Sequence, residues 1–477
     1  MKQRAKEMKI FLPGSFLAMA IAVYCILANE NHLYEYLYII PAAYAVGLWI
    51  FGFLLQEKTI YKVSLVFYIS QALMYIRYVI TPFFTVFSAK YTSWGWGPDP
   101  TDGEMLCAEL LMCLEAWLLL TVQFLAIRRF SKPKYLSKTL LPRNCIYDES
   151  ILLIVYAIFA CGMVLLVQPK LLIMDKYFGY SSTKNLVQAV PLQGLFVILA
   201  DTFKKVFLIV ALTICKKGYD RKKNKLFLVL AVLSVAVNMA LNSGSTRIRM
   251  VFALILGVYF LNYVFGKIPR VFYVVGGALC LVSFVSVSLV KFSYAINESS
   301  TNPVVSIILV MSGQFQDYFA GPRLVGQMFG VHRVYGDSIG VSTFLNDFLG
   351  SVPFVSNFID QTNRINYLFN IYCGITNQTL IAPVLGIGYC YFPCFPFFFS
   401  MIFEYFAIRL DYAMASTNRI SYKYLYAYMG YLCAMCMGYS TQNIFAQFAN
   451  AFVPLWVLFK VNDWLKLKIN TLSGGKS

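Results

Sequence analysis

A short polar turn between two apolar stretches has the spacing most suggestive of chemistry in this chain. It reads Asn-Ser-Gly-Ser-Thr-Arg-Ile-Arg over residues 242–249. Ser245 or Thr246 can cap the helix that follows, and the free N–H groups of a first helical turn bind anions. Arg247 and Arg249 add positive charge, although residues two apart point to nearly opposite sides of a helix. We predict an anion site here, with anchoring at lipid headgroups as the alternative.

The stretch 291–378 holds a second group of ionisable side chains. Asp317 and Arg323 flank a Gly-Pro turn, and His332 and Arg364 follow. Guanidinium groups bind phosphate bidentately and stay charged, so they can neutralise a diphosphate without metal. Asp317 or His332 can take a proton from a hydroxyl group. Each of these residues can also be a solvated loop charge, and Asp317 can simply pair with Arg323.

Three charged residues interrupt an otherwise apolar run over residues 195–215. They are Asp201, Lys204 and Lys205. Two interpretations stay open. Either the lysines extend to the outer membrane interface, or they form a basic site inside an outward-open cavity.

Arg77 and Glu115 lie within two neighbouring apolar runs, each about ten residues from the outward end. They should therefore lie at similar depth. An ionised side chain at the centre of a bilayer costs at least ~3 kcal/mol, so each needs a partner. We predict an ion pair with a structural role.

Metal chemistry is disfavoured. The chain has only two histidines, His32 and His332, and neither has metal-type spacing. Cys433 and Cys436 have C-x-x-C spacing, but they lie in an apolar run and are better explained as buried small side chains. No cofactor is predicted.

The elements that must position these residues are membrane helices. Hydrophobic residues make up 59% of the 477 positions and charged residues 13%, against roughly 25% charged in a soluble domain. Apolar runs of about 20 residues recur along the chain, and in lipid such runs must be helical. The formal charge of +18 comes from Lys and Arg clusters between these runs, which argues against a nucleic-acid-binding face.

We predict an all-α polytopic membrane protein of about twelve transmembrane helices, with 1–477 as a single integral membrane domain. The expected spans are residues 10–28, 34–54, 63–87, 105–126, 150–168, 195–215, 226–242, 248–265, 271–290, 379–403, 424–440 and 443–460.

Basic clusters define the orientation. With both termini in the cytoplasm, about 27 of the 40 Lys and Arg lie inside, as the positive-inside rule requires. The stretch 291–378 then becomes one long extracytoplasmic loop between the ninth and tenth helices. Its apolar residues recur at helical spacing, which predicts amphipathic helices on the membrane surface. They are Phe344, Leu345, Phe348, Leu349, Val352 and Val355.

Three short stretches carry a family resemblance: Ser243–Arg249, Tyr318–Arg323 and Asn377–Gly388. The outward S-G-S-T-R turn resembles that of the O-antigen polymerases, the Wzy-like oligosaccharide repeat unit polymerases of bacterial envelopes. That family also has about a dozen helices and a long periplasmic loop with essential arginines. Thr246 and Ile248 depart from the family's common Ser-Arg-Gly turn, which leaves the choice between Arg247 and Arg249 open.

The resemblance implies a metal-independent membrane glycosyltransferase in the bacterial plasma (inner) membrane, acting in lipopolysaccharide or capsule synthesis. It would move the growing glycan from undecaprenyl diphosphate to a new lipid-linked repeat unit. Asp317 or His332 would be the catalytic base. The candidate diphosphate-binding residues are Arg247, Arg249, Arg323, Arg364, Lys204 and Lys205. Implied partners are undecaprenyl-diphosphate-linked oligosaccharides, membrane lipids, and a chain-length regulator and flippase of the same pathway.

Two other functions remain open. A flippase or transporter of lipid-linked oligosaccharides would need only short connections and two similar halves, whereas this chain has one long asymmetric loop and no visible repeat. An O-antigen-type ligase, which moves the finished glycan to another acceptor, is not distinguished by any sequence feature.

Overall fold

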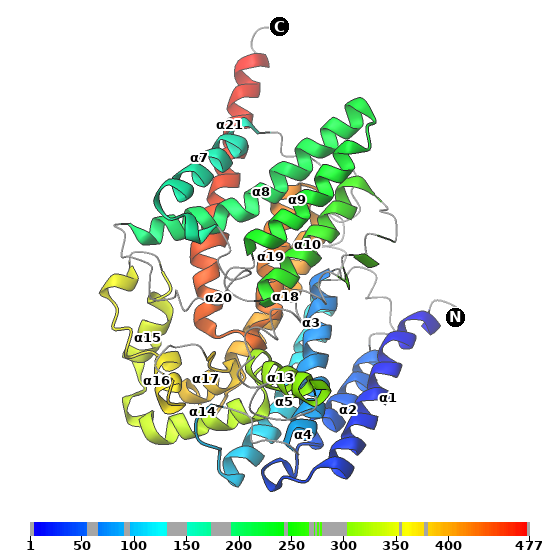
Figure 1. Cartoon of the computed structure of the whole chain (residues 1–477), viewed down its shortest axis with the longest axis vertical. Coiled ribbons are helices and arrows are strands. Elements are labelled where there is room, and N and C mark those ends of the chain that lie inside the picture. The colour runs from blue at the N-terminus through cyan, green and yellow to red at the C-terminus, as the bar shows by residue number, and fades with distance from the viewer. Residues whose placement is uncertain are drawn as a thin grey trace. The chain divides into compact units, whose positions relative to one another are not determined.

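The structure is a computed structural model, and it describes residues 4–54, 65–89, 96–130, 150–172, 192–242, 247–266, 271, 274–275, 277–278, 303–352, 355–375 and 380–474. All regular elements in these ranges are helices (Figure 1). The chain forms two compact units. Unit 1 is Met1–Leu140, Tyr294–Ser416 and Met429–Ala446. Unit 2 is Leu141–Ser293, Thr417–Tyr428 and Gln447–Ser477.

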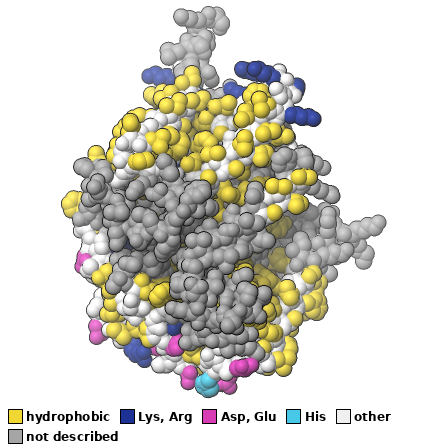
Figure 2. Space-filling view, in the orientation of Figure 1, with side chains coloured by type: hydrophobic (Ala, Val, Ile, Leu, Met, Phe, Trp, Pro, Cys, Tyr) yellow, Lys and Arg dark blue, Asp and Glu magenta, His cyan; other side chains and the backbone are white. Residues whose placement is uncertain are grey.

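Within the described ranges, five helical segments are long and apolar enough to cross a membrane. They are Phe11–Ala28, His32–Leu54, Leu65–Ala89, Asp102–Phe130 and Thr441–Lys468. Many large apolar side chains on the helices point outward, such as Leu27 and Leu166, which are 80% and 83% exposed. Hydrophobic side chains cover much of the described surface in Figure 2. Such a surface suits lipid rather than water, which supports the prediction of a helical, membrane-embedded protein.

Unit 1 is built around the long helix α5, which packs against α2, α14 and α18. Its helices are α1 (Arg4–Ala28), α2 (Ile39–Leu54), α3 (Leu65–Tyr75), the π-helix η3 (Ile76–Ile80), α4 (Thr81–Ala89), α5 (Asp102–Phe130), α13 (Pro303–Tyr318), α14 (Pro322–Tyr335), α15 (Val341–Leu349), α16 (Ile365–Tyr372), α17 (Val384–Tyr391) and α18 (Phe398–Ser416).

Unit 2 is built around α8, which packs against α7 and α9, while α9 packs against α10. Its helices are α7 (Ile151–Val167), α8 (Gln193–Lys222), α9 (Leu226–Asn242), α10 (Arg247–Phe265), the π-helix η9 (Phe448–Phe452) and α21 (Val453–Gly474). The chain passes between the two units within α19 (Ile420–Ala434) and near the end of α20 (Thr441–Gln447).

Most of the expected spans correspond to helices, but one is wrong as a continuous helix. Residues 379–403 form α17 and α18, and the chain between them is not helical. Pro393 and Pro396 lie in this break. A proline removes a backbone donor and clashes with the preceding turn, so two of them end a helix however apolar its sequence is. Most of the expected span 271–290 lies outside the described residues.

The described part of the expected outward stretch 291–378 contains four α-helices, α13 to α16. One of them, α14, is far from a surface element, because its first ten residues, Pro322 to Val331, are all buried. It packs on α5, α16 and α17 (Figure 1). This part of the stretch therefore belongs to the core of unit 1.

The predicted ion pair between Arg77 and Glu115 is confirmed. An Nη atom of Arg77 lies 2.8 Å from Oε2 of Glu115, and both side chains are fully buried. Tyr78 donates to the same oxygen at 3.0 Å, and Ser400 donates to the other carboxylate oxygen at 2.6 Å. Arg77 also donates to the carbonyl of Met437. The pair therefore ties η3, α5 and α18 together.

Breaking this pair on one side should destabilise the protein more than replacing both partners. Arg77→Met leaves the Glu115 carboxylate buried without its cation, and we expect a loss of about 3–5 kcal/mol of unfolding free energy. The double variant Arg77→Met/Glu115→Gln removes both charges and should recover most of that loss. Thermal unfolding of the purified protein measures both effects. Equal losses in the two variants would show that packing, and not charge, is what matters here.

Candidate functional site

The helix α15 has two apolar sides with different environments. Phe344 and Phe348 point inward, where the Phe348 ring lies 4.4 Å from that of Phe445. Val341, Leu345 and Leu349 recur every four residues and are 75%, 47% and 40% exposed. Residues four apart share one helix face, so these side chains form an outward apolar stripe. The predicted apolar residues thus divide between the two sides of α15, and the outward stripe suits a lipid surface.

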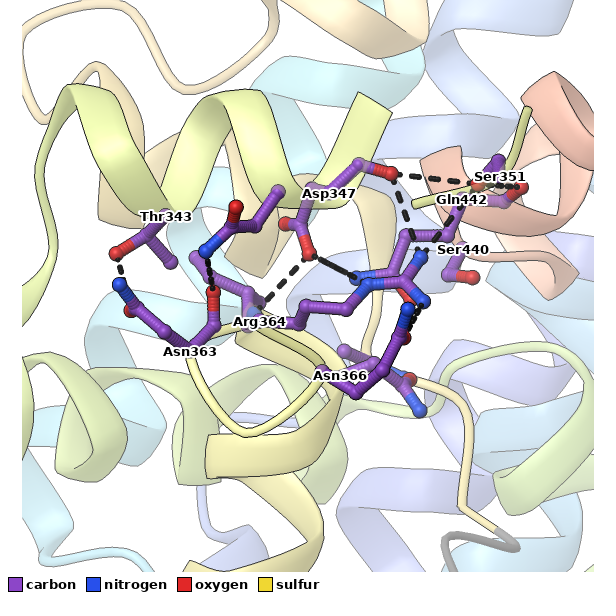
Figure 3. Close-up of polar contacts among 12 residues, drawn as sticks. Thr343, Asp347, Ser351, Asn363, Arg364, Asn366, Ser440 and Gln442 are labelled. Carbon is purple, nitrogen blue, oxygen red and sulfur yellow. Dashed lines mark hydrogen bonds and ion pairs between the residues drawn. The ribbon is translucent and has the colours of Figure 1, made fainter. Parts of the chain in front are cut away.

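A single acid, Asp347, lies on the inward side of α15 and is only 1% exposed. Its carboxylate accepts hydrogen bonds from three different elements (Figure 3). The backbone N–H of Ile365 donates to Oδ1 at 3.2 Å, and the amide of Gln442 also donates to Oδ1. The hydroxyl of Tyr391 donates to Oδ2 at 2.6 Å. Asp347 therefore joins α15 to the start of α16, the end of α17 and α20.

Arg364 is the cation of this cluster, and several of its N–H groups make long hydrogen bonds or none among the described residues. Its Nε lies 3.7 Å from Oδ1 of Asp347 and makes no hydrogen bond within the described structure. One Nη donates to the exposed Gln361 at 2.6 Å, while the other makes long contacts, 3.3 Å to the Asp347 carbonyl and 3.5 Å to the Ser351 hydroxyl. The side chain is 15% exposed. Nε is buried, so the donors that Arg364 can offer a ligand are those of the Nη group with long contacts.

Amide and hydroxyl side chains surround the pair. Asn363 accepts from Thr343 at 2.7 Å and donates to the exposed Ser342 at 3.3 Å. The amide of Asn346 donates to the carbonyl of Asn363 at 3.2 Å. Figure 3 shows Thr343 on α15 and Asn363 on the segment that leads into α16, near the Asp347–Arg364 pair. Groups of this kind both donate and accept, as recognition of sugar hydroxyls requires.

The carboxyl of Asp347 has a pKa much closer to neutral pH than that of an ordinary aspartate. Burial raises the pKa of its carboxyl from 3.8 to about 6, although Tyr391, Arg364, Ile365 and Gln442 all act in the opposite direction. Burial also lowers the pKa of Arg364, and Asp347 opposes that shift. A guanidinium nevertheless keeps its charge at neutral pH. Asp347 is thus suited to hold Arg364 and Tyr391 in place.

Arg323 differs from Arg364 because its guanidinium is fully engaged. Nε donates to Asp99 at 2.8 Å, and the two Nη atoms donate to the carbonyls of Trp96 and Gly97 at 3.3 and 3.1 Å. Gly97 has φ of +76° and lies tight against the backbone of Cys373, where a larger residue would not fit. Arg323 therefore secures the turn 96–99 on α14, and its partner there is Asp99.

The two candidate bases lie on α13 and α14. Asp317 is partly buried near the end of α13, within electrostatic range of Cys373. His332 is partly buried on α14, and its ring lies 5.1 Å from that of Tyr389. Its Nδ1 is buried with no hydrogen-bond partner in the described structure.

Arg323 and Arg364 lie at opposite ends of α16. Arg364 is the residue before its first turn, whereas Cys373 follows its last turn and contacts the turn that Arg323 holds. An eight-residue helix is about 12 Å long. These two candidate arginines therefore do not meet in one cluster.

The other candidate residues belong to unit 2. The turn 243–246 and the side chains of Arg247 and Arg249 lie outside what the structure describes, although α10 begins at Arg247 as expected. Lys205 is 2% exposed, donates to the carbonyl of Asp201 at 2.8 Å and lies 4.6 Å from the centre of the Tyr428 ring. Lys204 is partly buried beside it on α8. Lys205 is therefore an interior cation, which argues against the interpretation that it extends to the interface.

Sequence reasoning missed Asp347, Tyr391 and Gln442. A usable signal existed for Asp347, because a lone acid amid Phe344, Leu345, Phe348 and Leu349 is as unexpected as Glu115 in its span. Gln442 could not have been found, since it is 95 residues away along the chain.

The described residues contain no cluster of three or more His, Cys, Asp or Glu that could hold a metal ion. Searches of protein-family models, curated proteins and solved structures found no match to this chain.

The buried carboxyl predicts a pH effect on stability. The folded pKa of Asp347 is about 6 and its ordinary value 3.8, so the folded state binds more protons between these values. This contribution is fully present below about pH 4 and is lost as the pH rises through about 6, up to ~3 kcal/mol in total. Unfolding measured from pH 4 to 7 should show this slope in the wild type and lack it in Asp347→Asn. The same slope in both proteins would contradict this assignment.

The exposed stripe of α15 predicts contact with lipid. In protein reconstituted with bromolipids, the fluorescence of Leu345→Trp should be quenched relative to unbrominated lipid. The control is Asp360→Trp, at an exposed acid in the same expected loop. The native tryptophans supply a constant background, measured in the parent protein. Equal quenching at the two positions would exclude a specific lipid contact of α15.

Proposed function

We propose that this protein is a polymerase of lipid-linked oligosaccharide repeat units in a bacterial plasma membrane. In this proposal the chain crosses the membrane about twelve times, both termini are cytoplasmic, and the stretch 291–378 faces outward. The growing glycan on undecaprenyl diphosphate is the donor. A new lipid-linked repeat unit is the acceptor. The proposal makes the chain a metal-independent membrane glycosyltransferase of the O-antigen polymerase type.

The observation that carries the proposal is the state of Arg364. Its guanidinium is held loosely beside Asp347, one Nη makes only long contacts of 3.3 and 3.5 Å, and the side chain is partly open to solvent. A lipid-linked diphosphate keeps its tail in the bilayer and its charge at the interface. The outward apolar stripe of α15, the Arg364 guanidinium and the amide groups around Asn363 lie on neighbouring turns. They offer contacts to a lipid chain, a phosphate and a sugar, respectively. Few ligands other than a lipid-linked sugar phosphate need all three.

The reaction would proceed by substitution at a sugar carbon. A hydroxyl oxygen of the acceptor attacks the anomeric carbon of the donor, and the bond from that carbon to the phosphate oxygen breaks. The lipid diphosphate leaves with the electron pair, and the proton of the hydroxyl passes to a base. Asp317 and His332 remain the candidate bases, and both carry protonatable groups in unit 1.

Arginine would supply the electrostatic part of catalysis. Arg364 would stabilise the charge that grows on the diphosphate as the bond breaks, with Asp347 as its positioning residue. Arg247, Arg249, Lys204 and Lys205, which belong to unit 2, remain candidate diphosphate-binding residues in this proposal. Arg323 would contribute by holding the turn 96–99 in place.

Substitution of Arg364 tests the proposal in cells whose own copy of the gene is deleted. Arg364→Ala and Arg364→Lys should lower the yield of long glycan by about 100-fold or more, because lysine cannot reproduce the fork of the guanidinium. Single repeat units should still reach the final acceptor. Gln361→Ala, which removes only the exposed partner of Arg364, is the matched control and should retain long chains.

The glycan pattern of the deletion itself separates the alternatives. Loss of a polymerase leaves one-unit glycans on the final acceptor. Long glycans stranded on the carrier would instead indicate a ligase, and units left facing the cytoplasm would indicate a flippase. Wild-type chain lengths in Arg364→Ala would overturn the assignment of this site.

A further inference from the structure

A second buried acid, Glu404, lies in the middle of α18 and is fully buried. The helix packs there against α3 and α5, which belong to two of the membrane-length segments. Glu404 takes no part in the proposed reaction and lies outside the Asp347 cluster. Its surroundings differ from those of Glu115, which is also fully buried.

The two carboxylate oxygens of Glu404 have unequal environments. Oε1 accepts from the hydroxyl of Ser70 at 2.8 Å and from the amide nitrogen of Gln123 at 2.7 Å. Oε2 is buried and has no hydrogen-bond partner in the part of the chain that the structure describes. Ser70 lies on α3 and Gln123 on α5, so one oxygen joins three helices while the other meets none of their polar groups.

No described Lys, Arg or His forms an ion pair with Glu404, whereas Arg77 neutralises Glu115 at 2.8 Å. Titratable groups within electrostatic range of Glu404 include Tyr44 on α2, Cys433 on α19 and Cys436 in the short helix that follows α19. All of these are neutral at ordinary pH. Cys436 is also within range of the Arg77–Glu115 pair, whose two charges offset each other. The hydroxyl of Tyr44 is itself buried without a partner among the described groups.

An ionised carboxylate in such a place would be unstable. Burying an isolated charge costs several kcal/mol even after the protein relaxes, and two neutral donors on one oxygen offset only part of that. The charge must be removed by a proton or balanced by a bound cation. The groups at Oε1 favour a proton over a bound cation. The Ser70 hydroxyl and the Gln123 amide direct hydrogens, and not lone pairs, at the carboxylate, so they are not placed to bind a cation there. A bound metal cation would instead need several oxygen ligands around it.

We propose that Glu404 is a proton-binding site within unit 1, which carries its proton on Oε2 and is neutral while α3, α5 and α18 stay packed. Separating these helices admits water, and the carboxyl then releases the proton. Helix packing and proton binding are therefore coupled at this residue.

Infrared spectroscopy of the full chain in lipid, at neutral pH, tests the proposal with a matched pair of variants. The wild-type-minus-Glu404→Gln difference spectrum should contain the C=O stretch of a protonated carboxyl group, shifted in D₂O. The same substitution at Glu115 should instead remove carboxylate bands, because that side chain is paired with Arg77. Glu404→Gln should leave the melting temperature unchanged, whereas Glu115→Gln should lower it.

Two results would overturn the proposal. One is loss of carboxylate bands, with no loss of a protonated C=O band, in Glu404→Gln. The other is a Glu404 carboxylate band that appears only with added Na⁺, which would make this a cation site. Should Glu404→Gln fail to fold, Glu404→Asp retains an acid and should shift the frequency of the protonated band. An unchanged protonated band in that variant would likewise contradict the assignment.

Discussion

The ion pair between Arg77 and Glu115 shows the constraint on which unit 1 depends: a charge inside it must be compensated by the protein. Neither side chain is exposed, so water contributes nothing to their solvation. Three helical elements meet at this pair because each supplies a partner to it. In an apolar surrounding an unpaired partner would cost more than the pair gains, which makes the correct packing of η3, α5 and α18 a condition for burying either residue.

The same constraint explains the candidate site. Asp347 is nearly as buried as Glu115, but it meets neutral donors and one loosely held arginine in place of a tight ion pair. Asp347 therefore neutralises Arg364 only in part. In the proposal the remaining positive charge of Arg364 attracts the diphosphate of the substrate. Location on α15, whose outer stripe suits lipid, favours a ligand that is itself anchored in the bilayer.

Many of the helices could be predicted from the sequence, because a long apolar run in lipid can satisfy its backbone hydrogen bonds only as a helix. The expected span 226–242 is α9 with the same bounds. The failure at 379–403 has a local cause, since hydropathy does not register the prolines that end a helix. The site was harder to predict. The ion partner of Arg323 is 224 residues away in the sequence, so spacing alone could not show that this guanidinium is engaged. Arg364 was a candidate because of its residue type, whereas its neighbour Asp347 was not considered.

The central claim is that the protein joins lipid-linked repeat units to one another, and reconstitution tests it most directly. Purified protein in lipid vesicles would be given a single lipid-linked repeat unit as both donor and acceptor, with a chelator present. We predict glycans of more than one unit and release of undecaprenyl diphosphate in step with each bond formed. Movement of the substrate between leaflets without any lengthening of the glycan would contradict the account.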